Sequence, residues 1–374
     1  MSGTRTGGVG ENASLDLLGR DRTPFLPDRV WVERDDVWVA VDRERDPRGW
    51  QASACADIPL ITQWDNGDHT ESDPGVSATC SSSQPSVVKR MLDALEPRDG
   101  GRVLDVGTGT GWVAALLKDR VGARGSVVSI EVDAGLAEAT RHNLAVAGVD
   151  VQVVTGDAFE EGGVDGLFDA VHVGCGMRVI PQWWIDRTRS GGMIVMPWGT
   201  DFHPYDRLLP LRVDRHSATG RLGTGLSFMK MRAQADAWRR AVGPEGWFDN
   251  TVRWEADADG ADVTAAVAGC GELVLGLLLP GVVKVVTGPD ADGDRTAYLY
   301  GHDSAAALGF GGGHGVSVAE FGPRALGDAF LTALRWWLDH GCPDPMGFGL
   351  TVDRRGRHVW FGSPEGPVVP PRLP

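Results

Sequence analysis

Several features that would mark a specialised class of protein are missing from this 374-residue sequence. It has only five cysteines, and no two of them form a Cys-x-x-Cys pair. This argues against a disulfide scaffold or a zinc site. Its nine histidines form no His-x-His or His-Glu-x-x-His pattern, so we expect no metal site. The sequence therefore favours a protein of the reducing cytoplasm that carries no metal.

Basic clusters and long apolar runs are also absent. Asp and Glu outnumber Lys and Arg by 51 to 36, and no Lys/Arg-rich block stands out. No overall positive field therefore exists to attract nucleic acid or an anionic membrane. The most apolar run, residues 272–286, is short and interrupted by glycine and proline, so we expect buried strands there and no membrane span. The first residues lack the apolar core of a signal peptide.

The length and the order of segments predict two domains. Residues 1–20 are rich in Gly, Ser and Thr and predict a flexible N-terminus. Gly, Pro and aromatic residues cluster at 242–250, which places the boundary between domains 21–240 and 241–374. From residue 102 strand-like runs alternate with helical patterns, which predicts an α/β, Rossmann-like, mainly parallel sheet with helices on both faces. The tail predicts a small α+β domain.

Three local patterns add detail to this prediction. Alternating apolar residues predict a strand hairpin near residues 30–41. Residues 81–95 predict a helix, with Ser83 as its N-cap and Pro85 in its first turn. After residue 206 two strand-like runs follow without an intervening helix, which predicts an antiparallel edge of the sheet.

A glycine-rich turn, "VGTGTG", joins a strand to a helix at residues 106–111. Glycines let the backbone bend sharply and lie against a ligand, and the following helix start favours polar or negative groups. Glu131 ends the next strand, where a carboxylate can accept two ribose hydroxyls. The turn by itself matches a dinucleotide site as well as an S-adenosylmethionine (SAM) site.

The acidic residues around the turn favour SAM. Asp105 precedes the glycines and suits an ammonium group better than a pyrophosphate, and Asp157 ends the third strand, where it can accept the adenine amino group. The alternative is that both acids only cap turns. SAM, with S-adenosylhomocysteine (SAH) as product, is thus the predicted cofactor. The candidate binding residues are Asp105, Gly107, Thr108, Gly109, Gly111, Glu131, Val132, Asp157, Ala158 and Gly174.

A second motif, "SSSQP" at residues 81–85, precedes the strand that leads to the turn. Together with "RVLDVGTGTGW", "GDAF", "FDAVHVG" and "GGMIVMPWG" it resembles the protein-L-isoaspartate O-methyltransferase family over residues 24–233. The resemblance implies SAM-dependent methylation of a carboxylate. It also implies that Ser83 lies beside the transferred methyl group and the acceptor carboxylate. Gln84 and Pro85 complete the motif, and Gln84 is a candidate substrate-binding residue. The family usually has Thr and an apolar residue where this chain has Ser81 and Ser82, so all three serines are candidate catalytic residues.

Methylation of a carboxylate does not need a strong general base, because an aspartate side chain is already ionised near neutral pH. The protein must desolvate the acceptor oxygen, hold it near the methyl group and screen its charge. Ser83 and the amides of a helix start could do this, so we interpret Ser83 as a positioning hydroxyl. The alternative is a plain N-cap.

The tail, residues 322–362, resembles the C-terminal region of homologues from gene clusters for ribosomally made, modified peptides, in graspetide and lanthipeptide systems. This implies methylation of an aspartate in a modified precursor peptide, followed by closure of the ester to an aspartimide. The tail would then help to recognise the peptide; alternatively it only covers a sheet edge or forms a dimer contact. The oligomeric state is left open.

Other interpretations and candidate residues stay open. The chain could instead repair isoaspartyl residues in damaged proteins, or be a binding module that retains SAM. A nucleic-acid N-methyltransferase is disfavoured, because "GCGMRVIP" replaces the Asp/Asn-Pro-Pro-aromatic motif after the fourth strand. Trp64 and His203 are candidate substrate contacts, against core packing for Trp64 and a solvated loop for His203.

Overall fold

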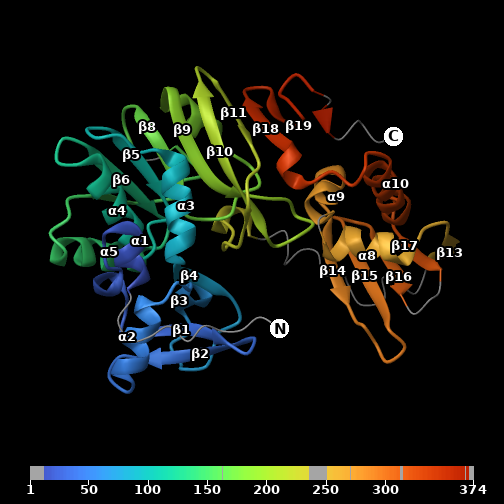
Figure 1. Ribbon diagram of the computed structural model, residues 1–374, viewed down its shortest axis with the longest axis horizontal. Coiled ribbons are helices and arrows are strands. Elements are labelled where there is room, and N and C mark those ends of the chain that lie inside the picture. The colour runs from blue at the N-terminus through green and yellow to red at the C-terminus, as the bar shows by residue number, and fades with distance from the viewer. Residues whose placement is uncertain are drawn as a thin grey trace. The chain divides into compact units, whose positions relative to one another are not determined.

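A computed structural model describes residues 12–161, 163–235, 251–269, 271–311, 315–366 and 368–369 (Figure 1). The chain divides into two compact units. Unit 1 consists of Met1–Cys175, Trp183–Met196 and Arg212–Arg215, and unit 2 of Gly176–Gln182, Pro197–Leu211 and His216–Pro374. The predicted boundary at 242–250 lies outside the described residues. The predicted flexible N-terminus is wrong in part, because Ala13–Leu18 form helix α1, capped by the Asn12 side chain.

Unit 1 begins with a four-stranded antiparallel sheet in the order β2-β1-β3-β4. The predicted hairpin is confirmed: β1 and β2 pair in register, and Asp35 and Asp36 between them adopt positive φ values of 50° and 62°, as a two-residue turn requires. Helix α2 packs on β1 and β2, with Trp50 buried in the core. The bounds are β1 Arg29–Arg34, β2 Val37–Asp42, α2 Pro47–Cys55, β3 Leu60–Trp64 and β4 Ala78–Ser82.

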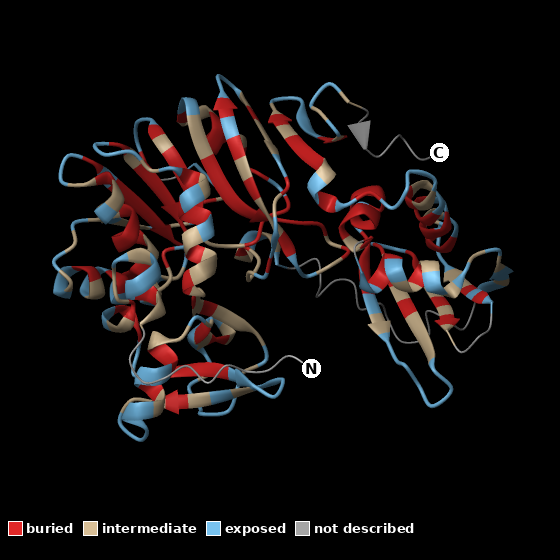
Figure 2. Ribbon diagram, in the orientation of Figure 1, coloured by how far each residue is buried: buried red, intermediate tan, exposed pale blue. Residues whose placement is uncertain are grey.

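The predicted alternation of strands and helices is confirmed in the rest of unit 1. Parallel strands follow the order β7-β6-β5-β8-β9, and β5, β6 and β8 are buried along most of their length (Figure 2). Helix α3 packs on β8, α4 on β5 and β6, and α5 on β6 and β7. The elements are α3 Pro85–Leu95, β5 Arg102–Val106, α4 Trp112–Val121, β6 Ser126–Glu131, α5 Ala134–Val146, β7 Gln152–Thr155, β8 Phe168–Val173, α6 Gln182–Asp186 and β9 Thr188–Trp198.

Helix α3 starts later than the sequence predicts. Ser81 and Ser82 belong to strand β4, and the N-cap of α3 is Gln84, not Ser83. Pro85 occupies the first helical position as predicted, where its missing N–H costs nothing and its fixed φ suits the helix.

In unit 2, strands follow the order β20-β19-β18-β11-β10, and β12 pairs with β10. The predicted antiparallel pairing after residue 206 is confirmed, because β10 and β12 pair antiparallel. The predicted edge is wrong, because β11, which the sequence analysis did not predict, lies next to β10 and pairs with β18 of the tail. The compact unit that contains the tail also includes residues 176–182 and 197–211 and resumes at residue 216, so it does not begin at residue 241. The bounds are β10 Asp206–Asp214, β11 Ser217–Arg221, β12 Gly225–Leu226, β18 Phe348–Asp353, β19 Gly356–Phe361 and β20 Val368–Val369, and the boundary between the units passes through β9 and β10.

Unit 2 also contains a five-stranded antiparallel sheet in the order β13-β17-β16-β15-β14. Helices α8 and α10 pack on β16. Residues 272–278, predicted as strand, form helix α9, because a continuous apolar run does not distinguish a buried helix from a buried strand. The bounds are β13 Val252–Ala256, α8 Gly260–Ala268, α9 Glu272–Leu278, β14 Val283–Thr287, β15 Asp294–Tyr300, β16 Ala305–Gly311, β17 Val316–Phe321 and α10 Leu326–Asp339.

No single helix among the described residues has the length and apolar composition to cross a membrane. Helices α8 and α9 meet those criteria only when taken together, as a pair bent by 88°.

Candidate functional site

The glycine turn between β5 and α4 has a backbone that favours glycine. Gly107, Gly109 and Gly111 have φ values of 82°, 55° and 90°, in the left-handed region that L side chains rarely adopt. At Gly111 a Cβ would also lie 2.9 Å from Thr140 Cγ2 on α5. The turn is therefore held in one shape by its neighbours and by its own conformation.

The turn lies where the strand order of the sheet reverses, between β5 and β8. Gly174, directly after β8, donates its N–H to Val106 O at 2.8 Å, and a Cβ at Gly174 would lie 3.2 Å from Gly107 O. In open α/β sheets, ligands bind at the carboxyl ends of strands at such a switch point. Gly107 and Gly174, both predicted from sequence, are thus brought together there.

Glu131 at the end of β6 also reaches the turn. Its Oε2 accepts the Gly109 N–H at 2.9 Å, and its Oε1 accepts the Asp133 N–H at 3.1 Å. A carboxylate at the end of this strand is of the type that accepts ribose hydroxyls. Val132 beside it is 45% exposed. The position of Glu131 fits the predicted donor site.

Asp157 and Ala158 follow β7, the strand next to β6. Asp157 is exposed, and its Oδ1 accepts the Phe159 N–H at 2.8 Å, so it does cap a turn. Ala158 is buried, and its carbonyl accepts the Trp184 indole N–H at 3.0 Å. The second Asp157 oxygen remains able to accept a ligand amine.

Asp105 corrects the sequence prediction. The residue is 1% exposed, and both of its oxygens accept hydrogen bonds from neighbouring strands: from His172 Nδ1 at 2.8 Å and from Ser129 Oγ at 2.6 Å. Strand alternation directs this side chain into the covered face of the sheet. The carboxylate therefore does not offer a free oxygen to an ammonium group.

The serine motif lies against the glycine turn. A Cβ at Gly109 would lie 3.4 Å from Cys80 Sγ and 3.7 Å from Ser81 O. The end of β4 thus meets the middle of the turn, although the two segments are nearly thirty residues apart in the chain. Ser82 is 2% exposed, and its hydroxyl is buried without a hydrogen-bond partner; it occupies the position that is usually apolar in the resembling family.

The start of α3 does not present the free amides that the sequence prediction assumed. Pro85 has no N–H, Asp57 Oδ1 accepts the Ser86 N–H at 2.8 Å, and Gln84 O accepts the next amide, that of Val87. The Gln84 side chain also donates to Asp57, at 3.3 Å. A carboxylate of the chain itself therefore occupies this helix start, and the Ser83 hydroxyl remains as the candidate positioning group.

A buried arginine that the sequence analysis missed holds this segment. Arg22 is fully buried and donates to the Ser83 carbonyl at 3.2 Å. Burial lowers the pKa of its guanidinium to about 10. Its other acceptors are the carbonyls of Ser53, Ala54, Ala56 and Ile58, at 2.8–3.1 Å.

Trp64 and His203, predicted as substrate contacts, both contact other residues of their own unit. Trp64 is 5% exposed and packs edge-on against Trp31 and Trp38, with ring centroids 6.3 and 6.2 Å away, so the packing alternative holds. His203, in unit 2, contacts Glu272 at 2.7 Å. Burial alone would raise the pKa of Glu272, but His203 and Lys284 outweigh it and keep that pKa below its ordinary value. His203 is therefore not a solvated loop residue, and its contact with substrate remains a prediction.

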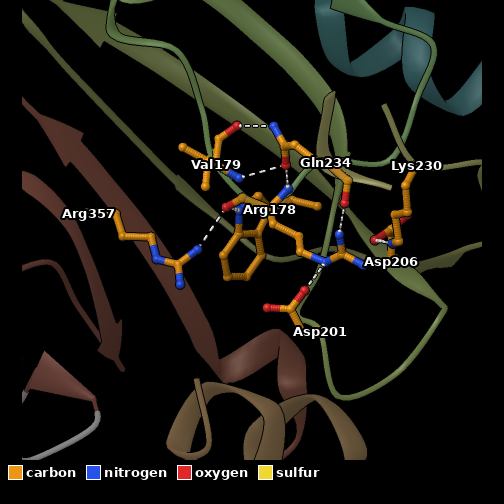
Figure 3. A network of polar contacts seen from close by, with 8 residues as sticks. Arg178, Val179, Asp201, Asp206, Lys230, Gln234 and Arg357 are labelled. Atoms are coloured by element: carbon orange, nitrogen blue, oxygen red, sulfur yellow. Dashed lines mark hydrogen bonds and ion pairs between the residues drawn. The ribbon is translucent and has the colours of Figure 1, made fainter. Parts of the chain in front are cut away.

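Unit 2 contains a polar network that follows β8 and β9 in the chain (Figure 3). Arg178 is 6% exposed, contacts Asp201 at 2.6 Å, and donates to the Gln234 carbonyl. Beside it, Lys230 is paired with buried Asp206. Burial raises the pKa of the Asp206 carboxyl to about 6, against the opposing effect of Lys230. No motif marks these residues, because they are distant in sequence.

Across the described residues, no three His, Cys, Asp or Glu side chains gather as metal ligands. The absence of a metal site remains a prediction.

The strand order, the switch point and the glycine turn define an α/β domain of the Rossmann-like methyltransferase type. The family model of the protein-L-isoaspartate(D-aspartate) O-methyltransferases matches residues 36–214. A protein-L-isoaspartate O-methyltransferase of Fervidobacterium nodosum is 31% identical over 157 residues, which are 42% of this chain and 72% of that protein. The chain belongs to the protein-L-isoaspartate O-methyltransferase family.

Two further similarities cover different shares of the chain. The protein-L-isoaspartate O-methyltransferase of Methanoculleus marisnigri is 41% identical over 31% of this chain and 52% of its own length. This chain thus spans about half the length of several curated relatives that it matches. A solved protein-L-isoaspartate O-methyltransferase structure is 19% identical, with a TM-score of 0.49, over 84% of this chain and 89% of that one.

Proposed function

We propose that this protein is a SAM-dependent carboxyl O-methyltransferase that acts on an aspartyl-type side chain in a polypeptide. One observation carries the proposal: the end of β4, which leads into Ser83, lies against Gly109 of the glycine turn. A segment that can present an acceptor thereby meets a turn that can hold a donor.

The described residues suit the binding of both the methyl donor and the acceptor. SAM supplies a sulfonium methyl group, which passes to a carboxylate oxygen as the carbon–sulfur bond breaks, with no proton transferred. Glu131 and Asp157 can accept hydrogen bonds from the ribose and adenine groups. Ser83 can donate its hydroxyl to the acceptor, and Arg22 fixes the backbone at Ser83. Positioning and desolvation of this kind can account for much of an enzyme's rate enhancement.

We further propose that the acceptor is an aspartate of a ribosomally made, modified precursor peptide, whose methyl ester then closes to an aspartimide. This is supported by the residues after 214, which lie beyond the family match and include β18, paired with β11, and β19, paired with β18. Repair of isoaspartyl residues is the second candidate, favoured by the activity in the names of the relatives.

Mass spectrometry separates these outcomes. The full chain is incubated with SAM and, in turn, an isoaspartyl peptide, its aspartyl version, and a modified precursor peptide of the graspetide or lanthipeptide type. Gain of a methyl group on the precursor, followed by loss of methanol, supports the first acceptor. Methylation of the isoaspartyl peptide alone supports repair, and no methylation of any of the three contradicts the proposed function.

Variants then test the role of the serine segment. Ser83→Ala should lower kcat about tenfold or more, as loss of one positioning hydrogen bond in a transition state does, while SAH affinity stays unchanged. Ser190→Ala is the control, because it removes a hydroxyl outside the serine motif, one that donates to Asp214 Oδ1 at 3.1 Å. If Ser83→Ala methylates as fast as the wild type, Ser83 is not the positioning hydroxyl.

A further inference from the structure

A row of polar side chains crosses the three central strands of unit 1 directly before the glycine turn. In the register of the sheet Asp105 on β5 pairs with Ser129 on β6 and with His172 on β8. Thr108, inside the turn, joins the row through Ser129. None of the four residues is more than 4% exposed.

The hydrogen bonds of this row have a definite direction. An ionised carboxylate only accepts, so Asp105 accepts from His172 Nδ1 at 2.8 Å and from Ser129 Oγ at 2.6 Å. The Ser129 proton is then committed to Asp105. The contact of 2.6 Å between the Thr108 and Ser129 hydroxyls therefore has Thr108 as donor. The chain runs from the turn to a buried charge, with His172 on the far side of that charge.

The neighbouring rungs of the same strands show that a polar row is not needed to build this sheet. Two residues earlier, on the same face of the sheet, Val103 pairs with Val127 and Ala170, and all three are buried. A buried charge is costly, and an apolar replacement of similar volume is often as stable or more so. A charged row directly before the glycine turn therefore indicates that these residues have a role in the turn.

We propose that His172, Asp105 and Ser129 are positioning residues that hold Thr108, and with it the glycine turn, in the shape that binds the methyl donor. This rests on the proposed function, because it concerns the same donor site. The buried charge acts through the hydroxyl of Thr108, and its neighbour Gly109 donates to Glu131. Asp105 thus shapes the whole site and makes no direct contact with the ammonium group.

The affinities for two ligands distinguish a positioning role of these residues from direct contact between Asp105 and the ligand. SAH carries the amino-acid group, whereas 5′-methylthioadenosine lacks it. Titration calorimetry should show that Ser129→Ala and His172→Leu weaken both ligands by the same factor, about tenfold for one buried hydrogen bond. His172→Asn places an amide N–H near the position of Nδ1 and should restore affinity to within about threefold.

The matched control is Thr188→Val on β9. The Thr188 hydroxyl is equally buried but donates to Trp184 O at 2.7 Å. This variant should lower the melting temperature and leave both affinities unchanged. Thr108→Val removes only the last hydroxyl of the chain and gives the same test if the core variants do not fold.

The possible outcomes are distinct. Loss of affinity for SAH alone would show that Asp105 contacts the ammonium group and would overturn the inference. Variants that bind both ligands like the wild type would overturn it while the proposed function stands. A wild-type protein that binds neither ligand would overturn the donor site itself.

Discussion

Substitution of Arg22 provides the strictest test of stability. Its guanidinium is fully buried and donates to five backbone carbonyls. Arg22→Met removes all of these donors and leaves the carbonyls to find water or rearrange. An unsatisfied buried acceptor costs about 1–3 kcal/mol, and partial rearrangement recovers some of the total. We therefore expect a loss of about 4 kcal/mol, the range in which breaking one side of a buried charged contact falls.

Arg22→Lys tests geometry separately from charge. Lysine keeps the positive charge but concentrates three donors on one nitrogen, whereas arginine spreads five over a rigid fork. We expect Arg22→Lys to recover about half of the loss, roughly 2 kcal/mol. It should still raise the KM for the acceptor peptide, because the donor to Ser83 O is lost or displaced, while SAH affinity changes little.

Urea unfolding followed by circular dichroism and fluorescence measures the free energy. Arg20→Met is the matched control, since Arg20 pairs with Asp119 at 2.5 and 2.6 Å in a partly exposed position. Such surface pairs contribute about 0–1 kcal/mol. If Arg22→Met unfolds with the same free energy as Arg20→Met, the carbonyl cluster does not hold the Ser83 segment, and the reasoning is refuted.

The remaining predictions concern other parts of the molecule. Because the folded-state pKa of Asp206 is raised to about 6, the folded form binds more protons between about pH 4 and 6, so its contribution to stability should fall as pH rises through that window. In urea titrations the double variant Asp206→Asn/Lys230→Met should lack this component, while Lys230→Met alone should cost about 3–5 kcal/mol. Gly111→Ala should lower the melting temperature more than Gly109→Ala, because only Gly111 combines a φ of 90° with a Cβ contact under 3.0 Å. Ser82→Ala should raise stability by about 1 kcal/mol, since it removes a buried hydroxyl without a partner.

Much of the parallel sheet was predictable because its signals are local. The alternation of apolar runs with helical patterns fixed β5 to β9 and the helices between them. The glycines and Glu131 could be placed together, since carboxyl ends of neighbouring parallel strands share one edge of a sheet. Fold class and donor-site position follow from such short-range patterns.

Features that depend on distant residues could not be predicted. The residues next to Arg22 in the sequence do not indicate that its side chain donates hydrogen bonds to the carbonyls of Ile58 and Ser83. The apolar run that forms α9 carries no period that separates helix from strand. The motif predicts that Asp105 contacts the ligand, but it does not indicate that Asp105 lies in register with His172 on β8.

At the start of α3 the sequence pattern predicted a chemical environment that differs from the one in the structure. From sequence, a helix start next to a serine suggests amides that stabilise an incoming carboxylate. In the structure Pro85 has no N–H, and Asp57 accepts that of Ser86. A second carboxylate would therefore meet a negative charge there and no free donor. Under the proposed function we expect the Ser83 hydroxyl to be a main donor to the acceptor, so loss of that one hydroxyl should affect kcat more than it would at an open helix start.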